Sequence, residues 1–202
     1  VTVGSGNAVT NVTVDAAGNL SQQLGTVGAG GGAYVWRVIA TANYTGDTST
    51  ATISGWSTNS LALRWGGPAR SSTTGVSDSW WTRINGDAGA NYTYALGQVL
   101  DAVFTPTSSG NYTAVLGLCP ARSCQPNLFG QHDGYIWGPN APIYKPCTVQ
   151  YFLATTNAGS LQARWVTAGQ SWRSTAVVTS LTHFAVSGSN MVDGTSWTVE
   201  SL

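Results

Sequence analysis

Apolar residues occur in this chain as short runs and alternating stretches, not as a helical stripe. Val, Thr, Tyr and Trp dominate these stretches, and no segment repeats apolar residues every 3.6 positions over a dozen residues. Alternation over four to eight residues is typical of a half-buried β-strand. The pattern predicts strands at Tyr34–Ala42, Thr50–Ile53, Leu61–Trp65, Gln98–Phe104, Tyr112–Leu118, Thr148–Ala154, Leu161–Val166, Thr175–Thr179 and Ser196–Val199.

Turn-forming residues separate these runs. Examples are Gly66-Gly67-Pro68, Asn85-Gly86-Asp87 and Gly138-Pro139-Asn140. Gly reaches positive φ without strain, Pro sets φ near −65°, and Asn and Asp bond to their own backbone. Short strands with frequent turns predict an all-β protein, an antiparallel β-sandwich that is either immunoglobulin-like or a jelly roll.

The first 32 residues differ from the rest. Residues 1–24 contain no Trp or Tyr and lead into a glycine-rich run at residues 28–32. We predict a polar N-terminal arm with a Gly-rich hinge over residues 1–32, which packs on a neighbouring molecule. The alternative is an ordinary first hairpin that turns at residues 15–19. Residues 33–202 form the predicted sandwich domain.

Short similarities recur within the chain. Ala33-Tyr34-Val35-Trp36 resembles Gly134-Tyr135-Ile136-Trp137, and Leu63-Arg64-Trp65 resembles Ala163-Arg164-Trp165. These offsets of 101 and 100 residues suit a duplicated β module with a boundary near residue 104. The alternative is that biased composition alone produces the matches.

Charge is scarce and balanced. Charged residues make up 8% of the chain, against about 25% in ordinary soluble domains, and the formal net charge is zero. This excludes nucleic-acid binding through a basic surface of this segment and a helical bundle held by Glu–Lys pairs. It also removes the electrostatic repulsion that keeps copies of a protein apart.

The sequence carries several signals of compartment. No apolar run reaches the ~20 residues that span a bilayer, and any export signal is expected to have been removed or to lie outside residues 1–202. Asn-x-Ser/Thr triplets, the acceptor sites for N-linked glycans, indicate an extracellular or cell-surface protein. In a chain as rich in Asn and Thr as this one, chance also produces such triplets. The glycosylation candidates are Asn11, Asn19, Asn43, Asn91 and Asn111.

Three cysteines, Cys119, Cys124 and Cys147, are candidates for one disulfide and one buried thiol. Their spacing does not match that of a zinc site, even with His132 as a fourth ligand, so no metal is expected.

Groups suited to catalysis are few. His132 and His183 are the only imidazoles, and no Gly-x-Ser-x-Gly elbow is present. His183 lies in a strand pattern with one face half buried, and His132-Asp133-Gly134 is typical of a turn. We expect no enzymatic activity and no cofactor; an extracellular hydrolase is the weakest of the function classes considered.

Tryptophan is the informative residue, with nine in the chain. Trp36, Trp65, Trp165 and Trp197 lie in strand patterns and are expected in the core. Aromatic side chains at loop-like positions suit contact with a sugar face or a protein partner. These ligand-binding candidates are Trp80, Trp81, Tyr135, Trp137 and Tyr144.

Two hypotheses of function follow. The first is a non-enzymatic extracellular subunit that self-assembles with copies of itself into a filament, pilus or shell, donating its arm as an extra strand. The alternative is a carbohydrate-binding adhesin or lectin domain that holds glycans through Trp- and Tyr-rich loops.

Overall fold

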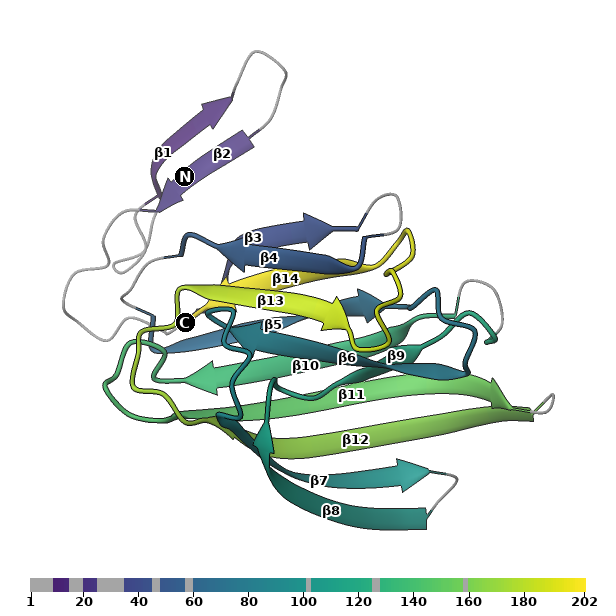
Figure 1. The fold of residues 1–202 in the computed structure, drawn as a ribbon. Helices are drawn as coiled ribbons and strands as arrows, with labels where there is room; N and C mark the ends of the chain where they lie inside the picture. The colour runs from purple at the N-terminus through teal and green to yellow at the C-terminus, as the bar shows by residue number, and fades with distance from the viewer. Residues whose placement is uncertain are drawn as a thin grey trace. The chain divides into compact units, whose positions relative to one another are not determined.

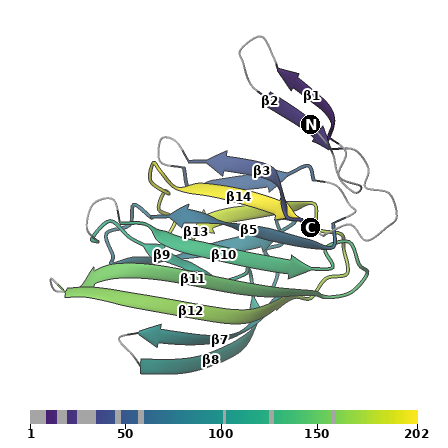
Figure 2. The same cartoon turned by 180° about the vertical axis from the view of Figure 1, so that it is seen from behind.

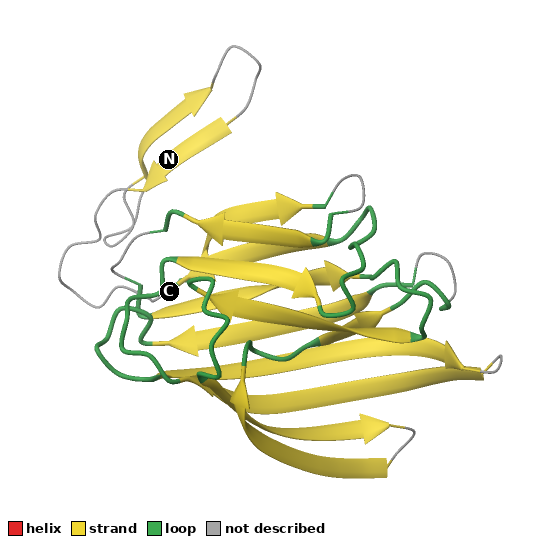
Figure 3. Ribbon diagram, viewed as in Figure 1, coloured by secondary structure: helices red, strands yellow, loops and turns green. Residues whose placement is uncertain are grey.

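The computed structural model describes residues 9–14, 20–24, 35–44, 48–56, 60–100, 103–124, 128–157 and 160–202. Every helix or strand assigned among these residues is a β-strand, which confirms the all-β prediction (Figure 3). The chain divides into two compact units, residues 1–35 and residues 36–202.

The first unit contains one antiparallel hairpin. Its strands are β1 (Val9–Val14) and β2 (Leu20–Leu24), and Val14 lies opposite Leu20. The turn at residues 15–19, the glycine run at residues 28–32 and the glycosylation candidate Asn19 all lie outside the described residues.

The second unit consists of two antiparallel sheets (Figures 1 and 2). The larger sheet contains, in spatial order, β3 (Arg37–Asn43), β14 (Ser196–Ser201), β5 (Ala62–Ala69), β10 (Gly130–Trp137), β11 (Lys145–Asn157), β12 (Ser160–Trp172), β7 (Tyr92–Leu100) and β8 (Val103–Tyr112). The smaller sheet contains β4 (Thr50–Ser54), β13 (Ser180–Ala185), β6 (Ser77–Ile84) and β9 (Leu118–Pro120).

The order of pairing identifies the sandwich as a jelly roll. β3 pairs with β14, β4 with β13, β5 with β10, and β6 with β9, so strands near the start of the unit pair with strands near its end. A long hairpin that is rolled up produces these nested pairs and the two orders β3-β14-β5-β10 and β4-β13-β6-β9. Of the two sandwich types predicted, the strand order matches the jelly roll.

Two inserted hairpins extend the larger sheet beyond β10. One is β11–β12, whose register runs from Lys145 opposite Trp172 to Asn157 opposite Ser160, and the other is β7–β8. β12 pairs with β7, so both hairpins continue the same sheet. β8 itself spans residue 104, and each sheet contains strands from before and after that position.

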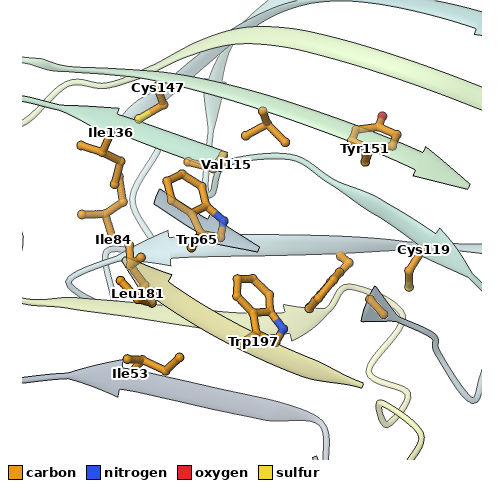
Figure 4. Packing of buried hydrophobic residues seen from close by; sticks show 14 of the residues in the cluster. Ile53, Trp65, Ile84, Val115, Cys119, Ile136, Cys147, Tyr151, Leu181 and Trp197 are labelled. Carbon is orange, nitrogen blue, oxygen red and sulfur yellow. The ribbon is translucent and has the colours of Figure 1, made fainter. Parts of the chain in front are cut away.

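The core lies between the two sheets and is rich in tryptophan (Figure 4). Trp65 and Trp197 are fully buried, as predicted. Trp65 lies directly opposite Gly134, and its indole occupies the space that a side chain at Gly134 would need. The expectation for Trp165 is wrong, because the inward positions of β12 belong to Val166 and its alternate neighbours, and Trp165 points outward with half its surface exposed. Trp36 is half buried and precedes β3.

Some strand predictions are also wrong. Residues 175–179 form no strand, and the sequence pattern missed β6 and β10. β6 begins with polar residues, but its buried Asp78 accepts hydrogen bonds from the hydroxyls of Ser71 and Ser187, both at 2.6 Å. These two partners, one of them 109 positions away in the chain, satisfy the carboxylate of Asp78, a residue whose local sequence is typical of a loop.

The predicted disulfide is not formed. Cys119, Cys124 and Cys147 are all free and buried. The thiol of Cys124 donates to the carbonyl of Val76 at 2.9 Å, and that of Cys147 lies 3.4 Å from the carbonyl of Lys145. Burial raises the pKa of Cys147 to about 12, so this thiol stays protonated.

Candidate binding face of the larger sheet

Alternation along β10 defines an outer face on the larger sheet. His132, Gly134 and Ile136 point into the core, while Gln131, Asp133, Tyr135 and Trp137 are exposed or half buried. Successive side chains of a strand point to opposite faces, so the second set lies on the face turned away from the smaller sheet. The outward residues of its neighbours β5 and β11, and of the next strands β14 and β12, complete this outer face.

Arg64 is the centre of a charged cluster on the outer face. Its guanidinium contacts Oδ1 of Asp133 at 3.1 Å and Oε2 of Glu200 at 3.2 Å, joining strands β5, β10 and β14. Partial desolvation lowers the pKa of Arg64, but the hydrogen bond to Asp133 and the neighbouring negative charges outweigh it, so the pKa is raised overall. All three side chains remain partly exposed, and Glu200 is the only glutamate of the chain.

Aromatic rings lie beside this cluster. Tyr135 is opposite Arg64 in the sheet, and the guanidinium carbon lies 5.7 Å from the centre of its ring. Tyr135 and Trp137 stack with an interplanar angle of 10° and ring centres 6.4 Å apart. Trp36 packs edge-on against Tyr135 at 5.9 Å and 73°. The rings of Tyr135 and Trp137 therefore have nearly the same orientation on one side of the charged group.

A depression of about 340 Å³ adjoins the cluster. Gly66 and Gly67 leave its floor without side chains, and a Cβ at Gly66 would collide with the His132 carbonyl and with Asp133. The other lining residues are Val38, Arg64, Pro68, Gln131, Asp133, Thr198 and Glu200. The depression is therefore a property of the sheet backbone, because no residue larger than glycine fits at position 66.

A second feature of the outer face is an apolar row across the inserted hairpins. Phe152 lies opposite Trp165, Trp165 opposite Val99, and Val99 opposite Phe104. Phe152 is 49%, Trp165 50% and Phe104 64% exposed. Beside this row is a shallow depression of about 560 Å³, lined by Ala95, Leu96, Gly97, Phe104, Pro106, Thr107, Ser108, Thr167 and Gly169. We call Phe152, Trp165, Val99 and Phe104 the apolar row, and we refer to the neighbouring hollow as its depression.

The five aromatic ligand-binding candidates separate in the structure. Only Tyr135 and Trp137 lie together on the outer face. Trp80 is buried between the sheets and has no surface to offer a ligand, and Trp81 contacts Phe184 of the smaller sheet edge-on. Tyr144 is exposed in the loop after β10, where it makes no ring contact with the described aromatic residues.

The sequence pattern missed the polar partners of the aromatic pair. Arg64, Asp133 and Glu200 are separated by 69 and 67 positions in the chain, so only the strand register brings them together. One local signal existed: Asp133, Tyr135 and Trp137 alternate along one stretch, as residues on one face of a strand do.

Both histidines lie in the core instead of on a surface. His132 stacks on Tyr151 and packs against Trp80, and His183 shares a hydrogen bond of 2.8 Å with Thr82. Burial lowers the pKa of His132 to about 3, and burial together with the neighbouring imidazole lowers that of His183. Both rings are neutral at physiological pH and out of reach of a substrate. Within the described residues, no group of three His, Cys, Asp or Glu side chains could hold a metal ion.

Three of the glycosylation candidates are exposed. Asn43 ends β3, Asn91 precedes β7, and Asn111 lies near the end of β8 with a positive φ of 65°. Asn11 lies in β1.

Comparisons with known proteins identify no relative: no family model, curated protein or solved structure matches the chain. Among the residues that the structure describes, no helix has the length and apolar character needed to cross a membrane.

Proposed function

We propose that this protein is a self-assembling structural subunit, and that its copies build a protein shell. Jelly rolls serve as shell subunits of viruses, as lectins and as cupins, so the fold alone does not select a function. The observation that carries the proposal is the apolar row. It is formed by the two hairpins, β11–β12 and β7–β8, that the chain adds to the eight paired strands of the jelly roll.

The apolar row is large enough to be a contact surface. A buried Phe or Trp covers 150–250 Å², so three rings that are each about half exposed leave on the order of 300 Å² of aromatic surface in water. The largest exposed apolar patch on a typical monomer covers about 300–600 Å² and is often functional, which makes this row the candidate contact surface. The row lies on regular strands, so its shape is the same in every copy.

A second copy of this chain is the partner that best fits the row. None of the residues of the apolar row and its depression is charged, and the whole chain has no net charge. Two copies can therefore approach without electrostatic repulsion. The ring of Phe104 covers Gly97, but the floor beside it, at Ala95 and Gly169, carries only small residues and can accept an aromatic side chain from a neighbour. When the row of one copy enters the depression of a second copy, and its own depression receives the row of a third, the contact is head-to-tail and repeats into rings or larger assemblies.

The test is the size of the particles that the purified protein forms. Mass photometry and electron microscopy should show large regular assemblies, and the double variant Trp165→Asp, Phe104→Asp should give monomers of about 21.0 kDa. Thr41→Asp is the matched control, because Thr41 is exposed on the same face at the far edge of the sheet. Monomers in the unsubstituted protein, or assembly that survives both charges, would overturn the proposal.

The first unit has a separate test. We propose that residues 1–35 act as an arm that joins neighbouring copies, since an added strand covers an exposed sheet edge. Removing residues 1–35 should shrink or abolish the assemblies while the second unit keeps its thermal transition. Assemblies of unchanged size would show that the arm takes no part.

An extracellular or cell-surface location remains part of the proposal, supported by the exposed Asn43, Asn91 and Asn111. Secretion from a eukaryotic cell should then give a protein whose mass falls on treatment with an N-glycosidase. An unchanged mass would remove this support.

A further inference from the structure

We propose that the charged cluster of Arg64 and the ring pair Tyr135–Trp137 form a binding site for a neutral oligosaccharide. The site lies on strands β14, β5 and β10, whereas the apolar row lies on β11, β12, β7 and β8. The inference therefore stands independently of self-assembly.

The ring pair supplies the apolar part of a sugar site. Trp137 is 46% exposed and Tyr135 half buried, and their planes differ by only 10°. The faces of pyranose rings carry C–H groups that stack on aromatic faces, with the hydroxyls directed sideways. The edge-on contact of Trp36 fixes the orientation of Tyr135 before any ligand arrives. Little ordering is then left to oppose binding.

The charged cluster supplies the polar part. A guanidinium only donates hydrogen bonds and a carboxylate only accepts them, whereas a sugar hydroxyl does both. Asp133 and Glu200 each use one oxygen to hold Arg64, and a carboxylate has acceptor positions for several bonds. The amide of Gln131, at the edge of the same depression, adds a donor and an acceptor. This mixture suits a row of hydroxyl groups better than it suits an apolar partner.

The balance of charge selects the class of glycan. Two carboxylates against one guanidinium leave the cluster with one negative charge in excess. Sialic acids, sulfated sugars and phosphates would meet this charge and be repelled. A neutral oligosaccharide meets no such penalty, which distinguishes it from the anionic ligands that a lone arginine would attract.

The volume of the depression beside Arg64 sets a minimum length for the ligand. This volume of about 340 Å³ lies at the lower end of the 300–1,000 Å³ typical of ligand sites, so it suits a single ring. Tyr135 does not line the hollow but contacts Arg64, which does. One sugar unit in the hollow and the next on the ring pair therefore make a ligand of at least two units.

The experiment is a glycan array followed by isothermal titration with the best neutral oligosaccharide. Trp137→Ala should weaken binding about tenfold, the change that 1.4 kcal/mol produces. Arg64→Met should abolish it, because both carboxylates lose their partner. Phe104→Ala is the matched control: it also removes an exposed aromatic ring from the outer face, on β8 and away from Gln131 and Asp133, and it should leave sugar affinity unchanged. Thermal melting curves check that each variant is folded.

The outcomes separate this inference from the assembly proposal. Trp137→Ala should leave particle size unchanged, and Phe104→Ala should alter particle size without altering sugar affinity. Glu200→Gln, which removes the excess charge and keeps an acceptor oxygen, should retain neutral sugars. An array that binds only anionic glycans or none, or equal losses in Trp137→Ala and Phe104→Ala, would overturn the sugar site and leave the assembly proposal untouched.

Discussion

Acid should destabilise this protein through His132. The ring is 1% exposed, lies 5.2 Å from the ring of Trp80 and stacks on Tyr151 at 6.2 Å. Neither ring nitrogen has a hydrogen-bond partner among the described residues. The charged form would therefore lose its hydration and gain nothing, which is why burial lowers the pKa to about 3.

The size of the effect follows from the two protonation equilibria. In the unfolded chain a histidine has a pKa of about 6.5. Between pH 6.5 and pH 3 the unfolded state binds a proton that the folded state does not, so stability falls as the pH falls. The loss is about 1.4 kcal/mol per pH unit, or roughly 5 kcal/mol over the whole window. Since single domains have only about 5–15 kcal/mol of stability, this loss alone is a large part of it.

The measurement is urea denaturation from pH 7.5 down to pH 4, below the concentration at which copies associate. The unsubstituted protein should lose stability below pH 6.5, and His183, whose pKa is also lowered, adds to the slope. His132→Phe keeps a ring in the same space and removes the titrating nitrogens, so its slope should be smaller by about 1.4 kcal/mol per pH unit. At pH 7 the variant should be as stable or more stable, because two unsatisfied nitrogens are gone. Equal slopes in both proteins would refute the reasoning.

Two further predictions concern packing and access. Gly134→Ala should lower the free energy of unfolding by about 1–3 kcal/mol, since the methyl group would enter the indole of Trp65. Gly110→Ala is the control and should change it little, because among the described residues no side chain or backbone atom beyond its chain neighbours lies within 4 Å of the new Cβ. Lys145, the only lysine, is fully buried and donates to the carbonyls of Ala141 and Ile143, so an amine-directed reagent should modify it only after unfolding, as mass spectrometry would show. The three buried thiols should behave in the same way toward a thiol reagent. Rapid labelling of the amine or of any thiol in the folded protein would contradict the burial of these groups.

Local sequence was sufficient for the class of fold. Turn chemistry and alternation depend on residues within a few positions, so the all-β architecture and the burial of Trp65 and Trp197 were predictable. Strands with polar residues were not. β10 contains Gln131-His132-Asp133-Gly134, which is typical of a turn, yet the core buries the imidazole and β5 and β11 flank the strand on both sides.

Local sequence likewise predicts only part of the candidate site. Tyr135 and Trp137 could be selected from local pattern, but as loop residues, whereas they lie on β10, and the same pattern selected Trp80, which is buried. The charged cluster, the depression beside it and the apolar row could not be selected in this way, since each joins strands that are distant in the chain. Alternation determines which side chains of a strand share a face, but only the packing of the two sheets decides which strands become neighbours and in which register.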